Sequence, residues 1–316
     1  MSTELRIHPA SESERLQAYR NVHEVWNGGL SLDEHVERRL KSIQHNRAQW
    51  FVGCVNDKVV TSLGTYPLRF RLDDRIVSGI AIGAVHTVAE FRGQGFAPQL
   101  IGSVEQYHQA RSVEISLLYS DIKPSYYARL GYVQCDGWDR WFGVSDTEST
   151  PADAVAPRLR LQRACRSEAL RELSRIHDAF HEGMCFSIAR DADYWNYLLT
   201  KNLDDEFYWL RDSTDSNIGY VRLGFRGPQA VIRDLALQPP INENATLLID
   251  SLSQLARERA IERWGGWLPI SSWVNDEYSR KVRLREVTML KSLCAGIRID
   301  EEVIRDCQHL HEIDHV

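Results

Sequence analysis

The 316-residue sequence contains no Cys-x-x-Cys pair, although it has six cysteines. They lie singly along the chain, at positions 54, 135, 165, 185, 294 and 307. Thiols scattered in this way lack the paired spacing of a structural zinc site, and they are typical of a reducing compartment. We therefore expect free thiols, no metal and a cytoplasmic location.

Other absences exclude further classes of protein. The sequence has no apolar run long enough to span a bilayer, and its first residues, MSTELRIHPASESERLQ, lack the apolar core of a signal peptide. Positive charge is not in excess, because the net charge is −6 and the pI is about 6.0. These features disfavour a membrane protein, an exported protein and a generic nucleic-acid binder. The remaining composition, 43% hydrophobic and 26% charged residues, indicates a globular protein, and the length of 316 residues suggests two domains.

The order of predicted strands and helices restarts near the middle of the chain. The stretch SDTESTPADAVAP lacks apolar periodicity and predicts a linker at residues 146–157. Shifting the chain by 148 residues places the strand at 83–88 on 231–236, and it places Leu100 on Leu248. The second half is therefore predicted to be a diverged copy of the first. The expected parts are residues 1–145, the linker, residues 158–300 and a C-terminal tail at 301–316.

The stretch VHTVAEFRGQGFAPQLI predicts a strand, a glycine turn and a helix that begins near Phe96. Gly93 and Gly95 permit backbone angles that other residues avoid, and a helix N-terminus attracts anions. The turn either binds an anion or simply needs small residues. It is no Walker A loop, because Phe96 and Ala97 replace the Lys-Ser/Thr pair. It is no dinucleotide fingerprint either, because Pro98 replaces the third glycine.

The second copy lacks this turn. At the equivalent positions, 240–245, the sequence reads PINENA, so both glycines are lost and Glu243 stands in the place of Gly95. A carboxylate at a helix N-terminus repels a phosphate. Any anion is therefore expected on the first copy alone.

Two motifs together resemble the GNAT superfamily of N-acetyltransferases. The turn RGQGFA at 92–97 matches its Arg/Gln-x-x-Gly-x-Gly/Ala motif, and YYARLGY at 126–132 matches its aromatic-Tyr-x-x-Leu-Gly-aromatic signature. The segments EVWNGGLSLDEHVERRL and LLYSDIKPSYYARLGY are also similar to yeast-type lysine N-acetyltransferases. The paired plan resembles the enhanced-intracellular-survival acetyltransferases. The resemblance implies an α+β fold of tandem GNAT domains, each a twisted mixed sheet flanked by helices, with the second domain degenerate.

The resemblance also implies a reaction and a set of site residues. Acetyl-CoA would donate its acetyl group by direct attack of a primary amine, on a small molecule or on a lysine-type acceptor. Tyr127 falls on the position of the family's general acid, and Ser120 replaces an asparagine that contacts the cofactor in many members. The remaining cofactor-binding residues implied are His86, Thr87 and Val88 in the strand and Arg92, Gly93, Gln94, Gly95, Phe96 and Ala97 in the turn.

The sequence leaves the general base and the acceptor site open. The strand at 80–85 carries no glutamate; His86 has a suitable pKa, but its side chain could equally face the core. Glu24 and Trp26 could hold a cationic amine or simply end an amphipathic helix. The i,i+4 pair His177 and His181, like the histidines of the tail, is interpreted as structural or incidental.

Three further alternatives remain open at this point. The protein could be a non-catalytic CoA-binding sensor or scaffold, or it could transfer an acyl chain longer than acetyl. It could be a monomer or a homodimer, because the second copy could provide a pseudo-dimer contact within one chain.

Overall fold

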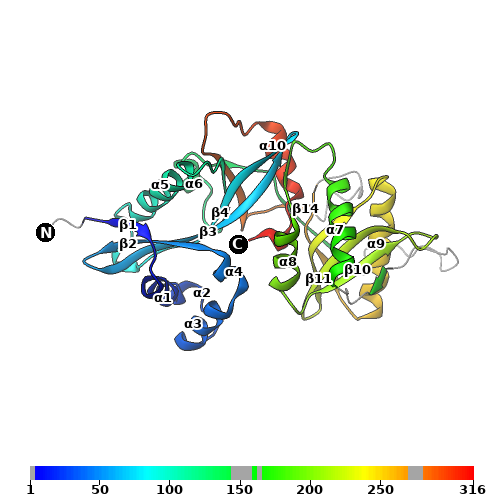
Figure 1. Ribbon diagram of the computed structural model, residues 1–316. Coiled ribbons are helices and arrows are strands. Elements are labelled where there is room, and N and C mark those ends of the chain that lie inside the picture. The colour runs from blue at the N-terminus through cyan, green and yellow to red at the C-terminus, as the bar shows by residue number, and fades with distance from the viewer. Residues whose placement is uncertain (1–3, 144–158, 162–165, 270–279) are drawn as a thin grey trace. The chain divides into compact units, whose positions relative to one another are not determined.

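The computed structural model describes residues 4–143, 159–161, 166–269 and 280–316, so the expected linker at 146–157 lies outside the described residues. The chain forms two compact units (Figure 1). Unit 1 comprises Met1–Cys135, Arg285–Ile304 and Val316, and unit 2 comprises Asp136–Leu284 and Arg305–His315. The division therefore falls at different residues from the expected boundaries, because each unit also takes up a segment from the C-terminal part of the chain.

Unit 1 contains a mixed sheet in the order β1-β2-β3-β4-β5-β15-β6. Its strands are β1 (Arg6–Pro9), β2 (Gln49–Val55), β3 (Lys58–Leu72), β4 (Arg75–Thr87), β5 (Ile115–Ser120), β15 (Val287–Ser292) and β6 (Val133–Gln134). Strand β4 runs antiparallel to β3 and parallel to β5. The parallel pair requires a crossover connection, and α5 (Phe96–Gln109) provides it.

The other helices of unit 1 follow clear sequence signals. They are α1 (Glu12–Asn21), α2 (His23–Trp26), α3 (Leu32–Lys41), α4 (Ile43–Arg47), the 3₁₀ turn η1 (Ala89–Phe91) and α6 (Ser125–Ala128). Ser11 and Ser31 begin α1 and α3 with capping boxes, each closed by a glutamate three residues later. Gly28 and Gly29 separate α2 from α3 with positive φ angles of 60° and 82°, as the break in periodicity predicts.

The core of unit 1 forms between α5 and the sheet. Leu100, Ile101 and Val104 of α5 are buried at helical spacing, in one cluster with Ile82 of β4 and Leu118 of β5. Burial of each such side chain contributes roughly 1.5–3 kcal/mol. This packing fixes the N-terminus of α5 at the end of β4.

Unit 2 contains a seven-stranded mixed sheet in the order β14-β7-β13-β12-β11-β10-β8. Its strands are β7 (Trp138–Gly143), β8 (Leu159–Leu161), β10 (Glu206–Arg211), β11 (Asn217–Arg226), β12 (Gln229–Leu237), β13 (Arg263–Trp267) and β14 (Arg280–Val282). The unit also holds α7 (Arg166–Phe180), β9 (Phe186–Ile188), α8 (Ala192–Lys201) and α9 (Ile241–Glu258). The protein is thus a mixed α+β structure with two sheets, as the sequence predicts.

The two units repeat one plan. The parallel pair β4 and β5 recurs as β12 and β13, and the 148-residue shift places β5 on residues 263–268, where β13 lies. The same shift places β7 on residues 286–291, next to the observed β15. Yet β15 pairs with β5 and β6 in unit 1, whereas β7 pairs with β13 and β14 in unit 2. The two copies have exchanged the equivalent strand.

The segment expected to be a tail is folded. It contains α10 (Glu301–Asp306) and the 3₁₀ turns η2 (Cys307–His309) and η3 (Glu312–Asp314). Val303, Cys307, Leu310 and Ile313 are almost fully buried. Burial of these four apolar side chains holds the segment inside the fold.

Candidate active site

The predicted turn lies between η1 and α5. Gly93 and Gly95 both have φ of +79°, and Gly95 caps α5 without a side-chain hydrogen bond. A Cβ added at Gly93 would meet nothing within 4 Å, and one at Gly95 would meet only Gln99 Nε2 at 3.8 Å. The backbone conformation, rather than crowding inside the chain, therefore requires glycine at both positions.

The first turn of α5 has the properties of an anion site. It carries no acidic residue. The amides of Phe96 and Ala97 lie where a helix provides no carbonyl partner, whereas Pro98 has no N–H to offer. The helix dipole adds positive potential at this end.

Strands β4 and β5 stop pairing before either strand ends. Their parallel register runs from Gly79 opposite Ile115 to Ile82 opposite Leu118, although β4 continues to Thr87. Ala84 has a positive φ of 52°, and the register with β3 shifts nearby. This irregularity turns the end of β4 away from β5.

Beyond that point, alternate residues of β4 face opposite edges. Val88 donates its N–H to the Val60 carbonyl at 2.9 Å, and the His86 carbonyl accepts the Thr61 hydroxyl at 2.9 Å, so both are committed toward β3. The alternation of a strand then directs the backbone of Val85 and Thr87 toward the edge that β5 has left. Of the three strand residues predicted to contact the cofactor, only Thr87 therefore directs its backbone toward the free edge, whereas His86 and Val88 direct theirs toward β3.

Four predicted side chains meet beside this strand. His86 Nε2 lies 2.8 Å from Glu24 Oε1, and the Arg92 guanidinium donates to the same oxygen. Arg92 Nε also donates to the Thr87 carbonyl at 2.9 Å. The Trp26 ring meets the His86 ring edge-on, with 6.4 Å between centroids. The sequence analysis assigned Glu24 and Trp26 to the acceptor and His86 and Arg92 to the cofactor or to catalysis. In the structure the four side chains form one cluster.

The cluster sets the state of His86. Its side chain is almost fully buried, and burial lowers its pKa below the ordinary 6.5, outweighing the Glu24 hydrogen bond that raises it. The imidazole is therefore neutral at pH 7. Because the Glu24 carboxylate accepts from Nε2, the hydrogen is on Nε2 and the lone pair on Nδ1.

Tyr127 lies on α6, buried within the same apolar cluster as Ile82 and Leu100, and its ring meets Tyr126 and Tyr132 edge-on. Burial raises the pKa of its phenol above the ordinary 10.0, so the hydroxyl stays protonated. Among the described residues, no hydrogen bond or ring contact joins Tyr127 to the His86 cluster.

Ser120 ends β5 and is buried. Its hydroxyl donates to the Ile122 carbonyl at 2.9 Å, which closes the turn that follows the strand. The structure therefore gives Ser120 a local structural bond. Gln94 likewise donates back to the Glu90 carbonyl at 3.3 Å.

Sequence reasoning missed two contributions to this site. One is the backbone of Val85, which only the observed alternation of β4 identifies. The other is β15, whose Val287 and Met289 belong to the cluster that holds Tyr127. The 148-residue repeat could have predicted a strand at β15, because the shift aligns β7 with residues 286–291.

The equivalent junction in unit 2 is closed at the turn, although β12 also continues to Leu237 beyond its pairing with β13, which ends at Ile232. Helix α9 begins at Ile241, so the residues that replace the glycine turn are helical, and Glu243 lies in its first turn. Asp234 stands at the position of His86 under the 148-residue shift. It is buried and receives two hydrogen bonds from Arg190, at 2.7 and 3.1 Å.

Comparison with known proteins agrees with the resemblance seen in the two sequence motifs. Residues 6–135 match the family model of the acetyltransferase (GNAT) domain. No curated protein matches the sequence. Among the described residues, no helix combines the length and apolarity that crossing a membrane requires.

Solved structures are similar over nearly the whole chain. A probable N-acyltransferase from Enterococcus faecalis shares 12% identity with a TM-score of 0.69, covering 92% of this chain and 73% of that one. A GCN5-related N-acetyltransferase from Anabaena variabilis shares 19% identity with a TM-score of 0.68, again over 92% and 73%. Saccharomyces cerevisiae N-myristoyltransferase, solved with bound myristoyl-CoA, shares 10% identity with a TM-score of 0.56, over 92% and 83%. At these identities the likeness shows the fold.

Proposed function

Because residues 6–135 match the family model of the acetyltransferase (GNAT) domain, we propose that the protein transfers an acetyl group from acetyl-CoA to a primary amine. The observation that carries the proposal is the open junction of β4 and α5. There an unpaired strand edge lies next to a glycine turn with no acidic residue in the first helical turn.

The residues of this junction fit acetyl-CoA. The turn at 92–97 and the first amides of α5 suit a diphosphate, and Arg92 adds a full positive charge. The backbone of Val85 and the N–H of Thr87 suit the amides of the pantetheine arm, which would extend the sheet as a further strand, whereas the Thr87 carbonyl already accepts from Arg92. When bound, the group supplies a thioester carbonyl as the electrophile.

His86 would act as the general base. An alkylammonium has a pKa near ~10.4 and must lose a proton before its nitrogen can attack. The neutral imidazole presents Nδ1 for that proton, and Glu24, bonded to Nε2 at 2.8 Å, would stabilise the imidazolium that forms. Trp26 and the half-exposed Glu24 carboxylate would attract the cationic acceptor before it reaches His86.

Tyr127 would act as the general acid. The attack forms the carbon–nitrogen bond and breaks the carbon–sulfur bond. The departing thiolate takes a proton from the phenol, and the proton that the new amide nitrogen loses restores the phenol. Burial keeps that proton on Tyr127 until the thiolate forms. Unit 2, whose equivalent turn is helical and carries Glu243, would bind no second acetyl-CoA.

The test is turnover of acetyl-CoA with a panel of primary amines, comprising free lysine, a polyamine, an aminoglycoside and a lysine peptide. Tyr127→Phe should lower kcat by about 10²–10⁴-fold. Tyr126→Phe, a change on the same helix, should retain activity. Cofactor binding without turnover of any amine would contradict catalysis and leave a CoA sensor. Turnover with longer acyl-CoA donors but not with acetyl-CoA would show that the transferred group is a longer acyl chain.

A further inference from the structure

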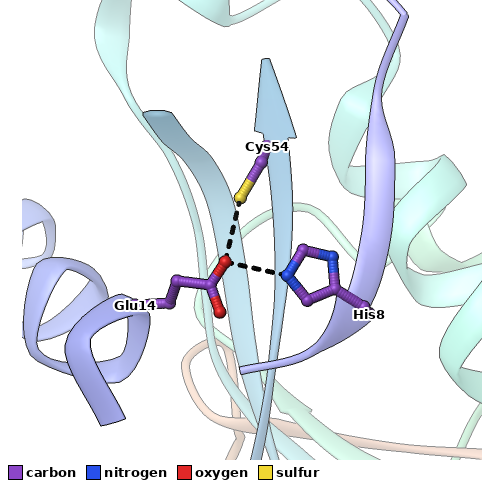
Figure 2. Close-up of side chains that lie close together, drawn as sticks. All are labelled: His8, Glu14 and Cys54. Carbon is purple, nitrogen blue, oxygen red and sulfur yellow. Dashed lines mark hydrogen bonds and ion pairs between the residues drawn. The ribbon is translucent and has the colours of Figure 1, made fainter. Parts of the chain in front are cut away.

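Three side chains of metal-ligand type meet on the first strands of unit 1 (Figure 2). His8 lies on β1, Glu14 on α1 and Cys54 on β2. Strand register places His8 opposite Val52, so His8 and Cys54 share one face of the sheet as diagonal neighbours. Helix α1 packs on this face and brings Glu14 between them.

The separations come close to those of a zinc site. His8 Nε2 lies 2.8 Å and Cys54 Sγ lies 3.7 Å from Glu14 Oε1. All three ligand atoms are within 4.8 Å of one another. Tetrahedral zinc with ordinary bond lengths places sulfur and oxygen about 3.6 Å apart and nitrogen and oxygen about 3.4 Å apart. Binding the ion would open the His8–Glu14 contact by roughly half an ångström and would place the His8 nitrogen about 3.6 Å from Cys54 Sγ, a pair that now lies within 4.8 Å.

Hydrogen bonds from Ser11 already orient the Glu14 carboxylate. Glu14 Oε2 accepts the Ser11 N–H at 2.8 Å and the Ser11 hydroxyl at 2.7 Å. These hydrogen bonds lower the pKa of Glu14 to about 2, so the carboxylate is ionised at neutral pH. Partners of this kind hold metal-binding carboxylates in place.

Helix capping does not by itself account for the cluster. The capping box of α3 uses Glu34 in the same way, since its Oε2 accepts the Ser31 N–H at 2.9 Å and the Ser31 hydroxyl at 2.6 Å. In α1, however, the remaining carboxylate oxygen also meets an imidazole and a thiol. A helix cap needs neither the His8 imidazole nor the Cys54 thiol, whereas a metal site needs such additional ligands.

The charges of the three ligands also match a divalent ion. A metal ion binds cysteine as the thiolate, so binding at Cys54 would displace the thiol proton. A thiolate and a carboxylate then neutralise two positive charges, and His8 binds as a neutral ligand. The His8 side chain is 38% exposed, which leaves a fourth position for water.

We propose that His8, Glu14 and Cys54 form a binding site for one divalent transition-metal ion of the zinc class. A ligand set of one nitrogen, one sulfur and one oxygen excludes magnesium and calcium, which prefer oxygen ligands. The site ties β1, α1 and β2 together and is independent of the acetyl-CoA junction.

The test is titration of the reduced, chelator-treated full chain with Co²⁺ as a spectroscopic substitute. Wild type should develop a near-ultraviolet thiolate-to-cobalt charge-transfer band that saturates at one equivalent and disappears on adding Zn²⁺. Cys54→Ser should lose the band. Cys135→Ser, which replaces another buried free cysteine of unit 1, should keep it.

His8→Gln keeps the exposed strand intact and guards against misfolding of the buried Cys54 variant. It should weaken Co²⁺ binding by at least about tenfold. The proposal is overturned if wild type shows no charge-transfer band, or if the band survives in Cys54→Ser. Unchanged affinity in His8→Gln would equally overturn the three-ligand site.

Discussion

The junction of β4 and α5 in unit 1 and that of β12 and α9 in unit 2 are equivalent places in two copies of one plan, yet they carry opposite chemistry. The first presents a glycine turn and a neutral histidine bonded to a carboxylate. In the second, the helix extends over the turn, and a buried aspartate pairs with Arg190 at the histidine position. A longer helix and a paired residue at the strand end thus distinguish the junction of unit 2 from the junction proposed to bind acetyl-CoA.

The largest expected effect of this difference is on catalysis. His86→Gln removes the proposed base from the open junction and should lower kcat by about 10²–10⁴-fold. The Kd for acetyl-CoA should change little, because no cofactor contact is assigned to the imidazole. Steady-state rates and calorimetry on one preparation separate the two quantities. A loss confined to binding would contradict the base assignment.

The next effect is on stability and concerns the closed junction. Asp234→Asn leaves Arg190 buried with Asp314 as its remaining carboxylate partner. Breaking a buried pair in this way should lower the free energy of unfolding by about 3–5 kcal/mol. Urea denaturation of Asp234→Asn and of the exposed-pair variant Asp215→Asn measures the contrast. The second variant should lose about 1 kcal/mol or less.

Acid should destabilise unit 2 through its buried histidines. Burial lowers the pKa of His181 to about 3 and that of His309 to about 4. Because these folded-state pKa values lie below the unfolded value of 6.5, their contribution is complete above pH 6.5 and is lost as pH falls toward 3–4. Each histidine should contribute a slope of about 1.4 kcal/mol per pH unit across that window.

Urea denaturation between pH 7.5 and about 4.5 tests this effect. The His181→Asn variant should show a shallower decline than wild type, because Asn does not titrate. A variant with the wild-type slope would show that His181 is not neutral in the folded protein.

The smallest expected effect is a proton taken up with acetyl-CoA. Arg92 lowers the pKa of His86, and Glu24 raises it. If a diphosphate draws Arg92 away from Glu24, the pKa of His86 rises and binding strengthens as pH falls below 6.5. Calorimetry in two buffers with different ionisation enthalpies detects the uptake, and Glu24→Gln should abolish it. An equal uptake in that variant would contradict the coupling.

The local elements were largely predictable from the sequence. The stretch from residue 85 to residue 101 indicated the end of β4, the glycine turn and α5, and the paired motifs indicated the fold. The 148-residue repeat also predicted the loss of the turn in the second copy, where α9 now carries Glu243.

The exchange of β7 and β15 was not predicted, because local periodicity does not specify which distant strand completes a sheet. The hydrogen bond between Glu24 and His86 was not predicted for a related reason. These residues are far apart in sequence, and side-chain direction decides whether they touch. The folding of the C-terminal segment was not predicted either, although its apolar residues Val303, Cys307 and Leu310 are almost fully buried.

The most direct test of the central claim is calorimetric titration of acetyl-CoA into wild type, Gly95→Glu and Gly102→Glu. Gly95→Glu copies the residue of the closed junction, whereas Gly102→Glu adds the same charge further along α5, where a Cβ meets nothing within 4 Å. We predict one site per chain in wild type and Gly102→Glu, and no measurable binding in Gly95→Glu. Two sites per chain, or a Gly95→Glu variant that binds like wild type, would contradict the claim that the open junction alone binds the cofactor.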